Sequence, residues 1–275
     1  MKAENLFVEF DSDEPDSSPE IYELNIISGG SRLYGYLLTP DKRAGSPCPA
    51  VIMSHGFPGY TTNNDLELAL MRSGCAVIHM NHRGAWGSEG NYLFTNLKDD
   101  LIAIAKWAHN PAIAEQYDID TDNIFLVGHS MGGQTVLNAA KELPFIRGVA
   151  AMAAYDIGAA FRYKLEKELF LMIETEGQCL EMNSASEVYE NALLNHDGLS
   201  ILNRAELLSQ RNVLLIEASF DTVAPADKMM KPLFERLKKL SACVKYESLK
   251  CGHSFAGQRM KLAEILGRWI ENTVQ

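Results

Sequence analysis

The chain has 275 residues, of which 47% are hydrophobic, and it carries a formal net charge of −11 at pH 7. A chain of this length can bury a large core, and a single α/β domain of this size is common. The negative charge argues against a nucleic-acid partner, because such proteins neutralise phosphates with clusters of Lys and Arg. No run of the sequence approaches the roughly 20 apolar residues that a membrane-spanning helix needs.

Two further features of the sequence bear on its compartment. The opening residues, Met1 to Asn5, lack the apolar segment of a secretory signal. The five cysteines are scattered and form no Cys-x-x-Cys pair, which favours reduced thiols over a disulfide framework. We therefore expect a soluble protein of the cytoplasm. The sequence leaves the oligomeric state open, with a homodimer among the alternatives.

The first forty residues predict three strands, at Leu6–Phe10, Ile21–Ser28 and Arg32–Leu38. An acidic stretch rich in Pro and Ser, Asp11–Glu20, separates the first two. Such a composition cannot bury enough apolar surface to become ordered, so we expect a mobile loop there. A Gly-Gly turn joins the second and third strands. The three strands together suggest an antiparallel meander at the edge of a sheet.

From Pro49 onward, short apolar strands alternate with helical segments. Fully apolar strands in such an alternation are typical of a parallel sheet that helices cover on both faces. The expected strands are Ala50–Ser54, Cys75–Met80, Asn123–Val127, Ile146–Ala153, Asn212–Ala218 and Cys243–Ser248. The expected helices are Asn64–Ser73, Leu97–Asn110, Gly132–Lys141, Ala226–Leu240 and one from about Phe255 to Glu271.

Residues 156–210 interrupt this alternation, since they show no clear strand pattern. Phe161–Met172 mixes Lys and Glu with Leu and Phe at helical spacing, and Glu187–Leu194 also favours a helix. A helical insertion between two strands of one sheet is more typical of a lid than of a separate domain. We therefore expect a core formed by residues 1–155 and 211–275, with a helical lid at 156–210.

The strongest local motif is Gly128-His129-Ser130-Met131-Gly132-Gly133, which follows an apolar strand. It matches the pattern G-x-S-x-G, in which a sharp turn from strand to helix exposes a serine hydroxyl. The helix N-terminus there favours a developing negative charge. The alternative is a glycine-rich helix cap with an incidental serine. The strand before the motif and the helix after it favour Ser130 as a nucleophile.

A serine nucleophile needs a base and an acid, which in this arrangement follow it in the order Asp or Glu, then His. Asp221 and His253 both come directly after predicted strands, so they satisfy order and location together. Asp227 and Glu217 are rival acids, but one falls in the first turn of a helix and the other within a strand. The expected task of Asp221 is to orient His253 and to stabilise its imidazolium. Of the other six histidines, five precede the nucleophile and one lies in the insertion.

Two loops after the first parallel strands complete the candidate site. In His55-Gly56-Phe57-Pro58-Gly59, the Phe57 N–H is the expected oxyanion donor together with the Met131 N–H, because Pro58 has no N–H to donate. The alternative for this segment is a plain turn. The second loop, residues 81–90, is expected to be structural, with substrate contact by Trp86 as the lesser alternative. No metal site is expected, because His79 and His82 lack further ligands.

Together these motifs resemble those of the α/β-hydrolase superfamily, from about Ile21 to the C-terminus. The combination of Ser54-His55-Gly56-Phe57, Asn81-His82-Arg83-Gly84 and the Ser130 motif is similar to that of lidded carboxylesterases and serine-aminopeptidase-like hydrolases. The resemblance implies an α/β fold with a mostly parallel eight-stranded sheet, helices on both faces and a helical lid. It also implies catalysis without a cofactor, through an acyl-enzyme. Many relatives have Asp at the position of Asn81 and Gly at that of Trp86.

The leading hypothesis is hydrolysis of a small or medium carboxylic ester. An acyl pocket would then be shaped by Tyr155, Phe161, Leu169, Phe170 and Met172, although packing of the lid on the core is the commoner role for such residues. The second hypothesis is a peptidase or amidase with the same Ser-His-Asp triad, in which lid carboxylates such as Glu166, Glu168, Glu174 or Glu176 bind a substrate amine. A binding module without catalysis is the third, and the retained triad argues against it.

Overall fold

The computed structural model describes residues 1–9, 17–42, 46–60, 63–240 and 243–274. Eight strands form one sheet in the order β1-β2-β4-β3-β5-β6-β7-β8. The pairs β1/β2 and β2/β4 are antiparallel, and all the other neighbours are parallel. The strands are β1 (Glu20–Ser28), β2 (Ser31–Thr39), β3 (Cys48–Ser54), β4 (Ala76–Met80), β5 (Ile119–His129), β6 (Ile146–Met152), β7 (Asn212–Ala218) and β8 (Val244–Leu249). The predicted α/β class with a mostly parallel eight-stranded sheet is confirmed.

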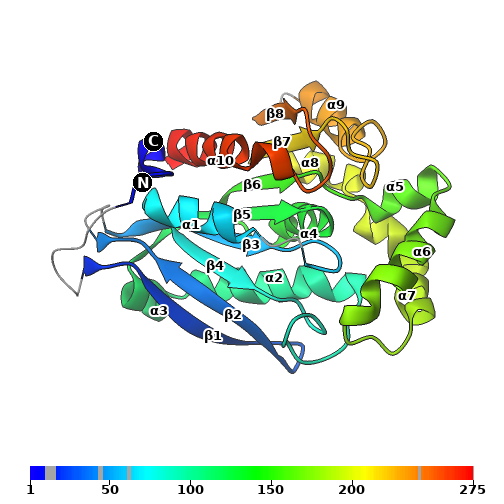
Figure 1. Ribbon diagram of the computed structural model, residues 1–275, viewed down its shortest axis with the longest axis horizontal. Coiled ribbons are helices and arrows are strands. Elements are labelled where there is room, and N and C mark those ends of the chain that lie inside the picture. Colours follow the sequence, from blue (N-terminus) through cyan, green and yellow to red (C-terminus); the bar gives the residue numbers. More distant parts are fainter. Residues whose placement is uncertain (10–16, 43–45, 61–62, 241–242, 275) are drawn as a thin grey trace.

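Helices cover both faces of the sheet (Figure 1). One face packs against α1 (Asn64–Arg72) and α10 (Arg259–Val274). The other face packs against α2 (Phe94–Ala108), α4 (Met131–Ala139), α8 (Ala205–Leu208) and α9 (Lys231–Lys239). A short helix, α3 (Pro111–Tyr117), leads into β5. Within the described chain, no helix is both long enough and apolar enough to cross a membrane.

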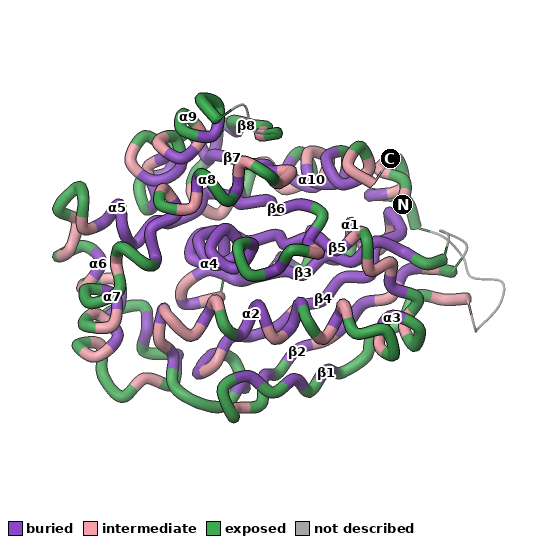
Figure 2. The backbone as a smooth tube through the Cα atoms, turned by 180° about the vertical axis from the view of Figure 1, so that it is seen from behind, coloured by how far each residue is buried: buried purple, intermediate pink, exposed green. Residues whose placement is uncertain are grey.

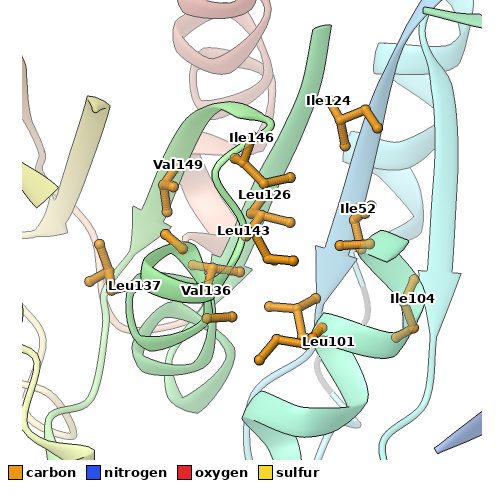
Figure 3. Close-up of a cluster of buried hydrophobic side chains, with 14 of the residues drawn as sticks. Ile52, Leu101, Ile104, Ile124, Leu126, Val136, Leu137, Leu143, Ile146 and Val149 are labelled. Atoms are coloured by element: carbon orange, nitrogen blue, oxygen red, sulfur yellow. The ribbon is translucent and has the colours of Figure 1, made fainter. Parts of the chain in front are cut away.

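The core explains why the central strands are apolar on both sides. Every residue of β3 is buried, as is every residue of α4 (Figure 2). Branched side chains of β3 and β5, such as Ile52 and Leu126, face Leu101 of α2 and Val136 of α4 (Figure 3). A strand buried on both faces has no polar side, so it shows a continuous apolar run rather than an alternation.

The predicted strand at Leu6–Phe10 is wrong over its described residues. Ala3–Asn5 form a short 3-10 turn, and Leu6 is buried against α10, where a Cβ atom on Gly267 would lie 2.8 Å from a Leu6 methyl. The edge of the sheet is therefore the two-stranded hairpin β1–β2. A single buried anchor residue and a short strand give the same apolar pattern. Phe10 and residues 11–16 of the predicted loop lie outside the described residues.

Several helix limits also differ from those expected. The helix predicted at Ala226–Leu240 begins at Lys231, and α3 was not predicted. The segment Phe161–Met172 is split between two helices, because Lys164 adopts a positive φ of 58°. Helix ends depend on local backbone geometry and are the least predictable part of a sequence pattern.

Residues 156–210, the helical insertion, leave the sheet after β6 and return before β7. They contain α5 (Ile157–Arg162), α6 (Glu166–Glu176) and α7 (Ala185–Leu199), which lie together at one end of the molecule (Figure 1). A single buried carboxylate joins the two ends of these three helices. Asp156 Oδ1 accepts hydrogen bonds from the N–H groups of Gly158, in α5, and of Ile201, beyond α7.

Burial raises the pKa of Asp156 to about 6, although its hydrogen bonds and Arg162 act in the opposite direction. The folded-state pKa of Asp156 is higher than the pKa near about 3.9 of an Asp in the unfolded chain. Such an acid stabilises the fold most at a pH below about 3.9, where it is protonated in both states. That contribution is lost as the pH rises through the folded pKa. At neutral pH the ionised Asp156 therefore costs stability.

We predict that Asp156→Asn gains stability relative to the wild type as the pH rises from about 4 to about 7, by on the order of 1–3 kcal/mol. The amide keeps an acceptor oxygen for the two N–H groups but cannot ionise. Urea denaturation at both pH values measures the difference. Asp197→Asn, at an exposed carboxylate of α7, is the matched control and should show no such gain. A difference that is the same at both pH values would contradict the prediction.

Candidate active site

The turn between β5 and α4 places Ser130 at the N-terminus of a helix. Its backbone adopts φ 56° and ψ −120°, a combination that costs a non-glycine residue on the order of 1–3 kcal/mol. Two backbone hydrogen bonds hold it there, from Ser130 N to Met152 O (2.9 Å) and from Tyr155 N to Ser130 O (3.1 Å). The strand-turn-helix context that the G-x-S-x-G motif requires is thus present.

The glycines on either side of Ser130 have no room for a side chain. A Cβ atom on Gly128 would lie 2.1 Å from the Gly132 carbonyl oxygen, and one on Gly132 would lie 2.1 Å from the Ser54 carbonyl oxygen. Both contacts are with backbone, which cannot rotate away. The motif therefore needs glycine at these two positions because α4 starts directly against the ends of β5 and β3.

Asp221 and His253 meet at the same edge of the sheet, in the loops after β7 and β8. His253 Nδ1 donates to Asp221 Oδ2 over 2.6 Å. Asp221 Oδ1 accepts hydrogen bonds of 2.8 Å from the N–H groups of Val223 and Ala224. Burial by itself would raise the pKa of Asp221, but the His253 ring and these N–H groups outweigh it and the pKa lies below its usual value. The ionised carboxylate fixes the proton on Nδ1 and leaves Nε2 available as a base.

His129 links the His253 loop to the serine turn. Its Nε2 donates to the His253 carbonyl oxygen over 2.8 Å, and the two rings lie 4.8 Å apart. Burial, followed by the charge of His253, lowers the pKa of His129 to about 3, so its ring is neutral. Within the described chain no hydrogen bond joins Ser130 Oγ to the His253 ring. Sequence reasoning missed His129, because a histidine inside the serine motif gives no signal of a contact 124 residues away.

The loop after β3 approaches the serine from the other side. A Cβ atom on Gly56 would lie 3.0 Å from Ser130 Cβ and 3.6 Å from its Oγ. His55 Nδ1 donates to the Gly56 carbonyl oxygen over 2.7 Å, and His55 Nε2 accepts from the His82 N–H over 3.3 Å. Burial, followed by His82, lowers the pKa of His55 to about 3, in keeping with this neutral tautomer. The N–H of Phe57 points opposite to the bound Gly56 carbonyl, because both belong to one planar peptide.

The loop of residues 81–90 packs behind the loop after β3. Arg83 pairs with the buried Asp100 through its side chain (2.6 Å) and its backbone N–H (2.9 Å). Trp86 Nε1 donates to the Pro58 carbonyl oxygen over 2.8 Å. The indole of Trp86 is thus bound to the backbone of the neighbouring loop, which is the structural role expected for these residues.

The candidate pocket residues lie around one apolar cluster. Tyr155, Leu169, Phe161 and Met172 belong to one apolar cluster with Phe57 and Met131. Phe170 packs edge-on against Tyr189 of α7, which borders the same cluster, with ring centroids 5.5 Å apart. The cluster also contains Tyr92, which the sequence did not single out; its hydroxyl is buried with no hydrogen-bond partner among the described residues.

A protein-family model described as serine aminopeptidase, S33, matches residues 45–189. This range covers more than half of the chain and contains both the loop after β3 and the Ser130 motif. The chain belongs to this family. A search of curated proteins found no match.

Solved structures show the same fold at low sequence identity. A brefeldin A esterase, titled a bacterial homologue of human hormone sensitive lipase, has 13% identity and a TM-score of 0.67, with 97% of this chain and 82% of that chain covered. Est1E of Butyrivibrio proteoclasticus, with ferulic acid bound, has 17% identity, a TM-score of 0.69 and coverage of 91% and 99%. An acylaminoacyl peptidase of Pyrococcus horikoshii has 18% identity and a TM-score of 0.70, and 93% of this chain spans 42% of its length.

We predict that Gly132→Ala displaces the end of β3 and lowers stability by about 1–3 kcal/mol. Hydrolase activity should fall by at least about 10²-fold, because a displacement of the order of 1 Å has that effect on positioned groups. Urea denaturation and initial rates on a p-nitrophenyl ester measure the two effects. The control is Gly198→Ala in α7, where a Cβ atom meets nothing within 4 Å; it should keep activity and gain up to about 1 kcal/mol. Equal behaviour of the two variants would refute the prediction.

Proposed function

We propose that this hydrolase is a serine hydrolase that cleaves a small or medium carboxylic ester through an acyl-enzyme. The observation that carries the proposal is the Asp221–His253 hydrogen bond of 2.6 Å, anchored by His129 next to a serine in a strained turn. A carboxylate that fixes the histidine tautomer beside a serine hydroxyl is the arrangement that activates a serine. Such a site needs no cofactor.

In the proposed reaction, Ser130 Oγ attacks the carbonyl carbon of the ester while His253 Nε2 takes the hydroxyl proton. The carbonyl electron pair moves onto oxygen, and the N–H groups of Phe57 and Met131 bind the resulting anion. When the tetrahedral species collapses, the C–O bond to the alcohol breaks and His253 protonates the departing oxygen. Water then repeats these steps on the acyl-enzyme and releases the acid and the free serine.

The helical insertion is proposed to act as a lid over this site. Its residue Glu181 forms two backbone hydrogen bonds with the core, to Gly84 O and from Tyr92 N, each 2.8 Å long. The Tyr60 hydroxyl donates to Glu176 of α6 over 3.0 Å. The cluster of Phe57 and Met131 with Phe161 and Met172 supports an apolar acyl pocket beneath the insertion. Phe170 contacts this cluster through Tyr189, so it stays a candidate for the pocket wall. Trp86 is proposed to lie outside the pocket because its indole is bound to Pro58.

A peptidase or amidase is the second candidate, and the family description favours it. It requires a carboxylate that binds a substrate amine, and α6 carries Glu166, Glu168, Glu174 and Glu176. Turnover of p-nitrophenyl butyrate compared with that of aminoacyl p-nitroanilides separates the two candidates. We expect the ester to be turned over faster. A preference for the anilide, removed by neutralising these carboxylates, would establish the alternative.

We predict that a fluorophosphonate probe labels the folded protein at Ser130 and that Ser130→Ala abolishes labelling. The variant should also lose at least about 10³-fold in kcat on p-nitrophenyl esters. Ser209→Ala, whose hydroxyl bonds locally to Glu206 O, is the control and should behave as the wild type. Mass spectrometry of the labelled peptide identifies the site. An unlabelled but folded wild type would indicate a binding module without catalysis.

A further inference from the structure

Two side chains hold the loop of residues 55–59 by its carbonyl oxygens. His55 Nδ1 binds Gly56 O over 2.7 Å, and Trp86 Nε1 binds Pro58 O over 2.8 Å. These two carbonyls flank the Phe57 N–H on either side along the chain. Both bonds therefore restrict the direction in which that N–H points. Trp86 differs from His55 in that it comes from another loop and adopts a positive φ of 46°, which a bulky residue keeps only where its surroundings enforce it.

The surroundings that hold Trp86 begin with Asn81. Asn81 Nδ2 donates to the Trp86 carbonyl oxygen over 3.0 Å. A carbonyl oxygen can only accept, so the amide nitrogen of Asn81 must face Trp86 and its Oδ1 must face the other way. That Oδ1 lies 3.2 Å from His79 Nε2. His79 Nε2 must therefore carry a proton and donate it.

The other ring nitrogen of His79 also faces an acceptor. Nδ1 lies 2.8 Å from Glu67 Oε1, and the Glu67 side chain is 1% exposed. Tyr36 OH donates to the second oxygen of Glu67, and its ring stacks on His79 with centroids 4.8 Å apart. With acceptors at both nitrogens, His79 is an imidazolium that forms a buried ion pair with Glu67.

The groups packed around His79 determine its protonation. Burial acts to lower the pKa of His79, but the Glu67 carboxylate and Asn81 outweigh it, so the pKa lies above its usual value near 6.5. Glu67 comes from α1, Tyr36 from β2 and Asn81 from the loop after β4, while the nearby His55 is neutral. The walls of a cavity of about 360 Å³ include the His79 ring, these four groups and Trp86. The cavity gives the His79 ring a route for exchanging its proton.

We propose that Trp86 is a positioning residue for the loop of residues 55–59, which carries the oxyanion donor Phe57. We further propose that the charged His79 side chain holds Trp86 in place through Asn81. The inference rests on the proposed function, because Phe57 is the donor being oriented. When the His79 imidazolium loses its Nε2 proton, the lone pair of Nε2 faces the lone pairs of Asn81 Oδ1. If the amide turns to relieve this contact, its oxygen meets the Trp86 carbonyl. Either arrangement frees Trp86 and loosens its bond to Pro58.

The first test is Trp86→Phe, which keeps an aromatic ring and removes the N–H that binds Pro58. We expect kcat on a p-nitrophenyl ester to fall about 10- to 100-fold, less than the roughly 10²–10³ caused by losing an oxyanion donor outright, with KM changed by less than about 2-fold. Trp107→Phe, in α2 against the core, is the matched control. An unchanged kcat overturns the proposal, as does a higher KM with kcat intact, which would make Trp86 a substrate contact.

A second variant guards against misfolding of the first. In Asn81→Asp, the carboxylate still accepts from His79 but cannot donate to the Trp86 carbonyl. It should lower kcat as Trp86→Phe does, with a KM close to that of the wild type. Wild-type kcat in a folded Asn81→Asp protein would overturn the proposal.

The pH dependence tests the role of His79. Wild-type kcat should decline on the alkaline side as His79 loses its proton. Glu67→Gln removes the charge that favours the imidazolium, so this decline should move to lower pH, and His79→Gln should abolish it. An alkaline decline that neither variant alters would overturn the proposal.

A readout without catalysis separates this inference from the proposed function. The chain has three tryptophans, so the indole N–H signal that Trp86→Phe removes can be assigned in an NMR spectrum. That signal should shift with the same pH midpoint as the His79 ring protons, and should stop titrating in His79→Gln. This result would stand even if the wild type hydrolysed no ester. A Trp86 signal that is independent of pH while His79 titrates would refute the coupling.

Discussion

Reversal of the chain at Ser130, from a buried strand straight into a buried helix, is the constraint on which the site depends. The reversal forces a positive φ on the serine and excludes a Cβ atom at Gly128 and Gly132. In return it points a hydroxyl out of the sheet edge at a helix N-terminus. The loops after β3, β7 and β8 end at that same edge because these strands run parallel to β5. Parallel topology thus brings together residues as far apart in the chain as Gly56 and His253.

The histidines described above divide into two groups according to whether the ring donates to a backbone carbonyl or to a carboxylate. His55 and His129 are buried and neutral, and each uses one N–H to hold a backbone carbonyl, that of Gly56 in the same loop and that of His253 in another loop. His253 and His79 each donate to a carboxylate, Asp221 and Glu67 respectively. The first class fixes backbone geometry without introducing charge. The second class contains the groups that gain or lose a proton in the proposals made above.

Individual residues show which features of the structure could be predicted from the sequence. The context of Ser130, and the positions of Asp221 and His253 after β7 and β8, were predicted from strand order and agree with the structure. The strand predicted at Leu6–Phe10 is wrong over its described residues, because one buried leucine against α10 gives the same local pattern as a strand. Trp86 received two interpretations from the sequence, and its hydrogen bond to Pro58 favours the structural one. Tyr36, Glu67 and His79 come from three separate elements, so no local pattern connects them.

By itself the sequence determined the α/β class, the alternation of apolar strands and helices from Pro49 onward, and the strand-turn-helix context of Ser130. These features follow from periodicity and from glycine spacing, which are local properties of the chain. Only the tertiary structure decided which side chains meet between loops: His129 with the His253 backbone, Trp86 with Pro58, and His79 with Glu67 and Asn81. Such contacts depend on how strands of similar apolar composition are ordered in the sheet and on where their loops turn. Hydrogen-bond direction then fixes the protonation of each ring, which no residue type specifies before its partners are known.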